Sequence, residues 1–155
     1  MKRFVALVVF VVMAIGVHAQ LPNKAEKLAG TWEYKFNSGF EVMELKGDEV
    51  VGMGYRINRK TGDTSKVETI RIRKVNKTLV YSMTNYKVVK DSVVATTQKM
   101  VSSGNKMKFY NISSLSPHAI KYSFGFLNRN KLFVRIYHNT DAKPVKLTLT
   151  RKKEE

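Results

Sequence analysis

Two glutamates stand among apolar residues in a pattern that could do chemistry inside a protein. Glu41 precedes Met43 by two positions, and Glu68 precedes Ile70 and Ile72 at the same spacing. In a strand, alternate positions share one face. A carboxylate on an otherwise apolar face must find a partner or keep its proton. We expect both glutamates to point inward and to orient the headgroup of a ligand. The alternative is an internal hydrogen-bonded network that only fixes the strand register.

Other side chains are candidates to share that interior. The expected ligand-binding set is Trp32, Glu41, Tyr55, Glu68, Tyr81, Asn111, Tyr122 and Arg135. Trp32 has two interpretations, because its indole could plug one end of the fold or form the floor of a ligand cavity. Two carboxylates across a cavity would also suit a glycosidase, which needs a defined separation and one raised pKa. The sequence shows neither of these.

Motifs of other catalytic and metal-binding classes are missing from the sequence. The chain has no Cys, and after residue 20 it has only His118 and His138, too few for the usual zinc site. Ser116 and His118 flank a proline without an evident acid to orient the imidazole, so chance proximity is favoured over a nucleophile and base. We expect no catalytic residue, no metal and no cofactor. An unusual carboxylate site is the enzymatic alternative.

The elements that position these residues are indicated by alternation along the chain. Apolar side chains recur at every second position in segments such as 51–57, 120–126 and 132–136, which is the period of strands with one buried face. Turn residues such as Asn37-Ser38-Gly39 and Thr61-Gly62-Asp63 separate these segments. The predicted strands span 31–36, 40–46, 49–58, 66–75, 77–85, 92–100, 106–112, 119–126, 131–137 and 145–151.

Successive strands joined by short turns predict an antiparallel meander. So many strands without covering helices must remove their exposed edges, and closure does so most completely. The predicted fold is therefore all-β, an antiparallel up-and-down β-barrel of 8 to 10 strands. A short helix over 24–29 would precede it, capped by Asn23 and Glu26. Gly52 and Gly54 leave one side of a strand open, which favours a bend of the barrel over a neighbouring side chain or a ligand.

The residues at the entry to the first strand, Leu28-Ala29-Gly30-Thr31-Trp32, resemble the Gly-x-Trp opening of lipocalins and their calycin relatives. The chain also resembles, over nearly the whole mature domain, a family of small exported bacterial lipocalin-like domains of unknown function. The matching positions are Gly30 and Trp32, Glu41, Gly52 and Gly54, Glu68 with Ile72, Leu79 with Tyr81, Phe109 with Asn111, and Pro117 with Ile120 and Tyr122. The resemblance implies a lipocalin-like barrel. Ser114-Leu115-Ser116 replaces the family's His-Asp-Phe, which puts in doubt any metal or acid–base chemistry of that segment.

The first 20 residues have the order of an export signal. Lys2-Arg3 precedes an unbroken apolar run over 4–17, and small side chains stand before Gln20. We expect cleavage after Ala19, because the run is shorter than the ~20 residues of a membrane-spanning helix. The predicted organisation is a signal peptide over 1–19 and a single lipocalin-like domain over 20–155. The mature protein would be periplasmic or extracellular, without a transmembrane segment. A small outer-membrane barrel is the rival, although Arg71 and Arg73 suit lipid poorly.

The strongly positive net charge indicates which classes of partner the protein could bind. The chain carries a net charge of +16, and removal of Lys2 and Arg3 with the signal peptide leaves +14. Such a surface attracts polyanions, and export favours anionic envelope components over nucleic acid. The basic residues are spread along the chain, which favours a soluble, repulsive surface. The predicted function is binding of a small apolar or amphipathic molecule in the barrel. The alternative is a filled barrel that acts as an adaptor or inhibitor through its basic surface.

Overall fold

The computed structural model describes residues 21–90, 92–102, 107–111, 121–138 and 143–153. The predicted signal peptide and the pair Ser116 and His118 lie outside these residues. Within them, a short helix α1 (Asn23–Glu26) precedes β1, and a 3-10 turn (Lys35–Asn37) follows it. The strands are β1 (Gly30–Tyr34), β2 (Gly39–Lys46), β3 (Glu49–Ile57), β4 (Thr64–Val75), β5 (Thr78–Val89), β6 (Ser92–Ser102), β7 (Lys108–Asn111), β8 (Lys121–Asn128), β9 (Lys131–Tyr137) and β10 (Val145–Arg151).

The sheet closes on itself. Each strand pairs antiparallel with the next one along the chain, and β1 pairs with β10. The closing pairs place Trp32 opposite Arg151 and Tyr34 opposite Leu149. Closure pairs the backbone groups that edge strands would otherwise leave open. The predicted antiparallel up-and-down barrel is confirmed, with ten strands in the described part of the chain.

Several predicted boundaries differ from the structure by one to four residues, and three differences at the first elements and at β5 have a local reason. Asn23 does not cap the helix, because the N-cap is Pro22 and no side chain bonds to the free amides there. The first strand ends before Phe36, because Phe36 and Asn37 have φ of 62° and 49°, outside the extended region. The fifth strand runs on to Val89 because its pairing with β6 continues to the hairpin turn.

The core fills the barrel at the end covered by α1. Leu21, Ala25 and Leu28 from the α1 segment are buried together with inward-facing strand residues such as Val50 and Ile72. The apolar side chains of the α1 segment therefore pack against the core of the barrel, and α1 covers this end. We call it the covered end.

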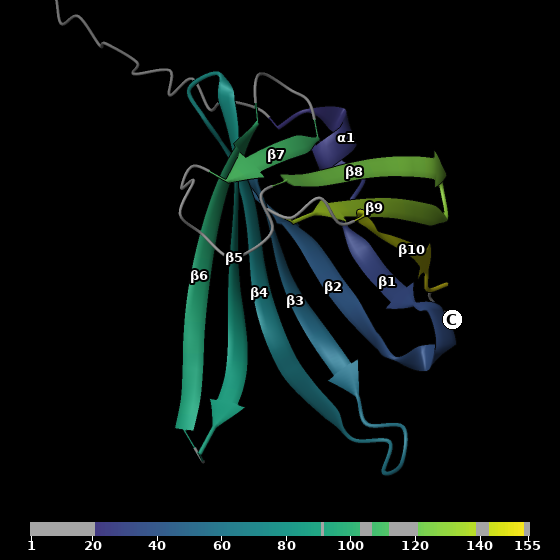
Figure 1. The fold of residues 1–155 in the computed structure, drawn as a ribbon. Helices are drawn as coiled ribbons and strands as arrows, with labels where there is room; N and C mark the ends of the chain where they lie inside the picture. The colour runs from purple at the N-terminus through teal and green to yellow at the C-terminus, as the bar shows by residue number, and fades with distance from the viewer. Residues whose placement is uncertain (1–20, 91, 103–106, 112–120, 139–142, 154–155) are drawn as a thin grey trace, which may run out of the picture.

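The opposite end is built differently, because the strands are of unequal length. β4, β5 and β6 are 12, 12 and 11 residues long, whereas β7 has only 4. Figure 1 shows β4, β5 and β6 running toward the foot of the view, well past β8, β9 and β10. Exposed residues occupy these extensions. We call this the flared end, and the two glutamates lie on the strands that lead to it.

Candidate ligand site in the barrel interior

The two predicted glutamates lie on one line across the sheet. Glu41 on β2 is opposite Gly54 on β3, and Gly54 is opposite Glu68 on β4. The same line continues to Trp32 on one side and to Asn85 on the other. Only one strand separates the glutamates, so their backbones lie roughly 10 Å apart. Inward-facing neighbours of both glutamates belong to the core, and the expected inward orientation is confirmed.

The glycines of β3 make room for these side chains. A Cβ atom at Gly54 would lie 2.5 Å from Cγ of Glu68, so the Glu68 side chain lies directly over this glycine. At Gly52 the space is taken by Met43 and Ile70, at 3.2 and 3.4 Å. The register of β3 with β4 also shifts just after Gly54. The irregular pairing agrees with the expected bend, and neighbouring side chains fill the open side.

Glu41 is buried and has a specific partner. The hydroxyl of Tyr34 on β1 donates a hydrogen bond to Oε1 of Glu41. The pKa of Glu41 is raised to about 7, chiefly because burial disfavours the charged carboxylate; the bond from Tyr34 opposes this rise, and the charge of Glu68 adds to it. Burial also raises the pKa of Glu68. Burial thus favours the protonated form of both carboxyl groups relative to surface glutamates.

An aromatic wall stands beside the carboxyl groups. The ring of Tyr81 packs against Phe109, Tyr122 and Phe124 at centroid distances of 5.4, 5.6 and 5.7 Å. Burial raises the pKa of Tyr122 to about 12, and the charges of Glu68 and Glu41 contribute to the rise. The Tyr81 pKa is raised for the same reasons, with burial as the largest cause. Both phenols therefore stay protonated and share one electrostatic environment with the glutamates.

Trp32 closes the line of residues toward the covered end. Its side chain is 0% exposed, and its indole N–H donates to the carbonyl oxygen of Leu28 over 2.7 Å. The guanidinium of Arg151 lies 4.2 Å from the indole ring and donates to the carbonyl oxygens of Ala29 and Lys27 at 2.5 and 2.8 Å. A buried indole with its polar edge satisfied matches the interpretation of Trp32 as a plug.

Two predicted residues lie away from this interior. Tyr55 shares the outward face of β3 with Met53 and stacks on Phe40 outside the barrel, at 4.9 Å. Arg135 is exposed and packs over the ring of Phe133 at 4.9 Å. The placements follow from alternation, because the inward positions of β3 are Val50 and the two glycines, and those of β9 are apolar. Asn111 is half-buried and has the same parity as the inward-facing Phe109.

The structure adds two interior residues that the sequence analysis did not single out. Tyr34 was visible in the alternation with Trp32, but its link to Glu41 depends on the pairing of β1 with β2. Gln98 on β6 is 7% exposed, and its Oε1 atom has no hydrogen-bond partner among the described residues. It lies opposite the buried Met83. Unmet hydrogen-bonding capacity in a buried amide is unusual and indicates a site for a further polar group.

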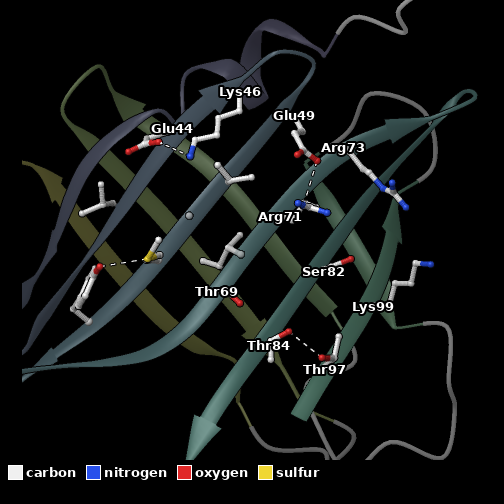
Figure 2. A pocket seen from close by; sticks show the side chains of 16 residues that line it. Glu44, Lys46, Glu49, Thr69, Arg71, Arg73, Ser82, Thr84, Thr97 and Lys99 are labelled. Atoms are coloured by element: carbon white, nitrogen blue, oxygen red, sulfur yellow. Dashed lines mark hydrogen bonds and ion pairs between the residues drawn. The ribbon is translucent and has the colours of Figure 1, made fainter. Parts of the chain in front are cut away.

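A separate hollow lies on the outer face of the sheet, over β2 to β6. Its volume is about 750 Å³. Figure 2 shows the polar side chains along it, including the ion pair of Arg71 with Glu49 at 3.3 Å and the hydrogen bond between Thr84 and Thr97 at 2.9 Å. Arg73 and Lys99 add positive charge to the same face. We call this the outer hollow.

Comparison with known proteins adds no name to this geometry. No model of a protein family matches the chain, and no curated protein sequence is significantly similar to it. In the described part of the chain, no helix has the length and apolar character needed to cross a membrane. Nor does any group of three His, Cys, Asp or Glu side chains among those residues have the arrangement of a metal site. The interior itself is the strongest guide to function.

Proposed function

We propose that this is an exported, lipocalin-like protein that binds a small amphipathic molecule in its barrel. Glu41 and Glu68 would hold the headgroup, and the aromatic wall of Tyr81, Tyr122 and Phe124 would cover the apolar part. One observation carries the proposal: Glu41 and Glu68 stand on either side of one glycine, with the Glu68 side chain over it, on a wall that is otherwise aromatic and aliphatic. Such a mixture of apolar surface and few directed polar groups is typical of small-molecule sites.

The polar groups of the interior also indicate what kind of ligand headgroup would fit. Carboxyl groups with raised pKa, phenols and the amide of Gln98 offer acceptors, whereas Arg135, the cation expected beside them, lies on the outer face. The complementary headgroup donates hydrogen bonds, as an alcohol or an amine does. The positive charge of an amine would favour ionisation of the adjacent glutamates, so an amine would gain further from charge attraction and from the faces of the aromatic rings.

Native mass spectrometry of the protein purified under non-denaturing conditions tests the proposal. We expect an adduct that is released on denaturation and identified in the organic extract as an amphipathic molecule. A panel of fatty alcohols and long-chain amines should then bind the emptied protein and shift its unfolding temperature. An unmodified mass together with no affinity for any panel member would contradict the proposal.

Two matched variants locate the site. Glu68→Gln keeps the shape of the side chain but removes its charge, and should weaken amine binding at least tenfold, in keeping with the strength of a charge-assisted hydrogen bond. Arg135→Gln makes the same kind of change on the outer face and should leave binding unaltered. Equal losses in both variants would mean that the ligand does not occupy the interior.

The alternative is a filled barrel that acts through its basic surface. Complete burial of Trp32, Tyr81 and Phe109 and the position of the outer hollow support it. In that case an acidic partner protein would bind over Arg71, Arg73 and Lys99. Arg73→Glu would then abolish binding of that partner, and Glu68→Gln would not affect it.

A further inference from the structure

The tip of the β5–β6 hairpin carries apolar side chains that face water. Val88 and Val93 are 69% and 68% exposed, and Val89 and Val94 are 42% and 47% exposed. Val88 and Val93 are opposite each other in the pairing of the two strands. They lie together on one face, and Val89 and Val94 belong to the other face because neighbouring residues alternate. We call these four residues the valine tip.

The valine tip stands apart from the rest of the molecule. Figure 1 shows the β5–β6 hairpin reaching the foot of the view, on the side away from α1, and the β3–β4 hairpin reaching it at the other side of the view. A hairpin in water normally keeps apolar residues on the face that packs on a core. Here both faces are apolar beyond the core, and an exposed apolar strand end of this kind is a liability unless something covers it.

Positively charged residues lie next to the valine tip. Lys87 and Lys90 flank it on the same hairpin and are exposed. The ammonium of Lys66, from the neighbouring hairpin, lies 5.2 Å from the ring centre of Tyr86 and so links the two hairpins. The β3–β4 turn, at the same end of the barrel, carries exposed Arg59 and Lys60. The acidic residues of the two turns are Asp63 and, outside the described residues, Asp91, so basic residues predominate.

The chemistry of the occupant follows from this combination. A second copy of the chain would bring the same positive charge to the tip and would be repelled. An acidic protein would be complementary to the positive charge, but its binding would not require valines on both faces. A bilayer with anionic headgroups offers hydrocarbon to the tip and negative charge to the lysines next to it, with the half-buried Tyr86 at the level where aromatic residues gather in membranes.

We propose that the valine tip docks on, and shallowly inserts into, the surface of an anionic lipid bilayer. The barrel then stands on the membrane with its flared end toward the lipid. This surface is distinct from the interior site, and its role does not depend on whether the interior holds a ligand.

Vesicle binding tests the charge and the valines separately. The protein should co-sediment with vesicles of equimolar phosphatidylcholine and phosphatidylglycerol, bind far more weakly to pure phosphatidylcholine, and lose affinity as salt rises. Lys87→Glu with Lys90→Glu should reduce the partition coefficient by more than about 25-fold, because each lysine near an anionic surface contributes roughly fivefold. Lys131→Glu with Lys153→Glu makes the same change in charge at exposed positions elsewhere and should have a much smaller effect.

Val88→Ser with Val93→Ser should reduce binding about tenfold or more, because the inserted apolar area is lost. Leu127→Ser is the matched control, since Leu127 is an exposed apolar residue of β8, 64% exposed. Equal binding of all these variants, or binding of the wild type to neutral and anionic vesicles alike, would overturn the proposal.

A fluorescent probe reports insertion directly. The chain has no Cys, so Val88→Cys provides a single thiol for an environment-sensitive dye. We expect a blue shift of the Val88→Cys label on anionic vesicles and none for a Leu127→Cys label. Vesicle binding without a blue shift at position 88 would contradict insertion of the tip. Self-association of the protein, suppressed by the serine variants and without vesicle binding, would identify a second copy as the occupant and would equally overturn it.

Discussion

The two ends of the barrel differ in how completely their polar and apolar groups find partners. At the covered end, Trp32 and Leu28 are fully buried, and the indole N–H and the guanidinium of Arg151 reach backbone carbonyls. Toward the flared end, Glu41 and Glu68 hold raised pKa values, and the valine tip lies in water. The covered end therefore supplies much of the stability, and the flared end keeps polar and apolar groups available for binding. Substitutions at the two ends should affect stability and binding separately.

Truncation of the indole at the covered end should have the largest effect on stability. Trp32→Ala removes a fully buried ring, its hydrogen bond and the surface on which Arg151 lies. We expect the free energy of unfolding to fall by about 4 kcal/mol, as for other buried aromatic residues. Urea denaturation followed by circular dichroism measures this change. Phe36→Ala is the control, because Phe36 is 82% exposed and its loss should cost less than about 0.5 kcal/mol. Similar costs in both variants would remove the distinction between the ends.

The second prediction concerns the pH dependence that Glu41 imposes. Its pKa is about 7 in the folded protein and 4.5 for an ordinary glutamate, so the folded state holds the proton more tightly. Its contribution to stability is complete below pH 4.5 and is lost as the pH rises through 7. Relative to Glu41→Gln, the wild-type free energy of unfolding should therefore fall by about 3 kcal/mol over this window. Thermal unfolding of both proteins across the pH range measures the difference. Parallel curves would show that Glu41 titrates as a surface residue does.

Crowding between Gly54 and Glu68 should give a smaller effect. Gly54→Ala places a methyl group where the Glu68 side chain lies, so Glu68 must move. The movement should cost about 1–2 kcal/mol, and it should vanish in a Glu68→Ala background, where the space is free. A double-mutant cycle by urea denaturation measures this coupling. Additive effects of the two substitutions would mean that the glycine serves the bend alone.

The smallest effect is expected at the valine tip. Val88→Ser with Val93→Ser alters side chains that are about two-thirds exposed, so stability should change by less than about 0.5 kcal/mol per residue. Differential scanning calorimetry should give nearly the same unfolding temperature for the variant and the wild type. A marked decrease would place the tip in the structural core of the protein and would end the division between a stabilising end and a binding end.

The strands and the barrel could be predicted because alternation is a local signal. β9 and β10 have the predicted bounds, and the inward face of β4 was recognised from Ile70 and Ile72, which follow an unexpected carboxylate at alternate positions. Edge avoidance then made closure the natural outcome for a meander of strands. The inward orientation of Glu41 and Glu68, on which the proposed site rests, followed from the same pattern.

What could not be predicted depends on contacts between distant residues. On β3 the apolar face carries Val51, Met53 and Tyr55, yet it points outward, because the glycines of the other face admit Glu68 and Met43. Because the more apolar face of β3 was expected to face inward, Tyr55 was wrongly predicted to lie in the interior. The bond between Tyr34 and Glu41 depends on the register of β1 with β2. The buried amide of Gln98 gave no local signal, since exposed polar residues precede it on the same strand.

The seam between β1 and β10 has a consequence for how the molecule is made. A ribosome delivers β1 early and β10 last, so the emerging polypeptide holds an unclosed ribbon with two bare edges until residue 151 is available. Arg151 then fastens the final strand to the backbone just before the first one. A nascent chain in this state would be bound by chaperones that protect exposed strands. Premature termination before position 145 would yield a product whose unpaired edge strands pair with those of other copies and aggregate.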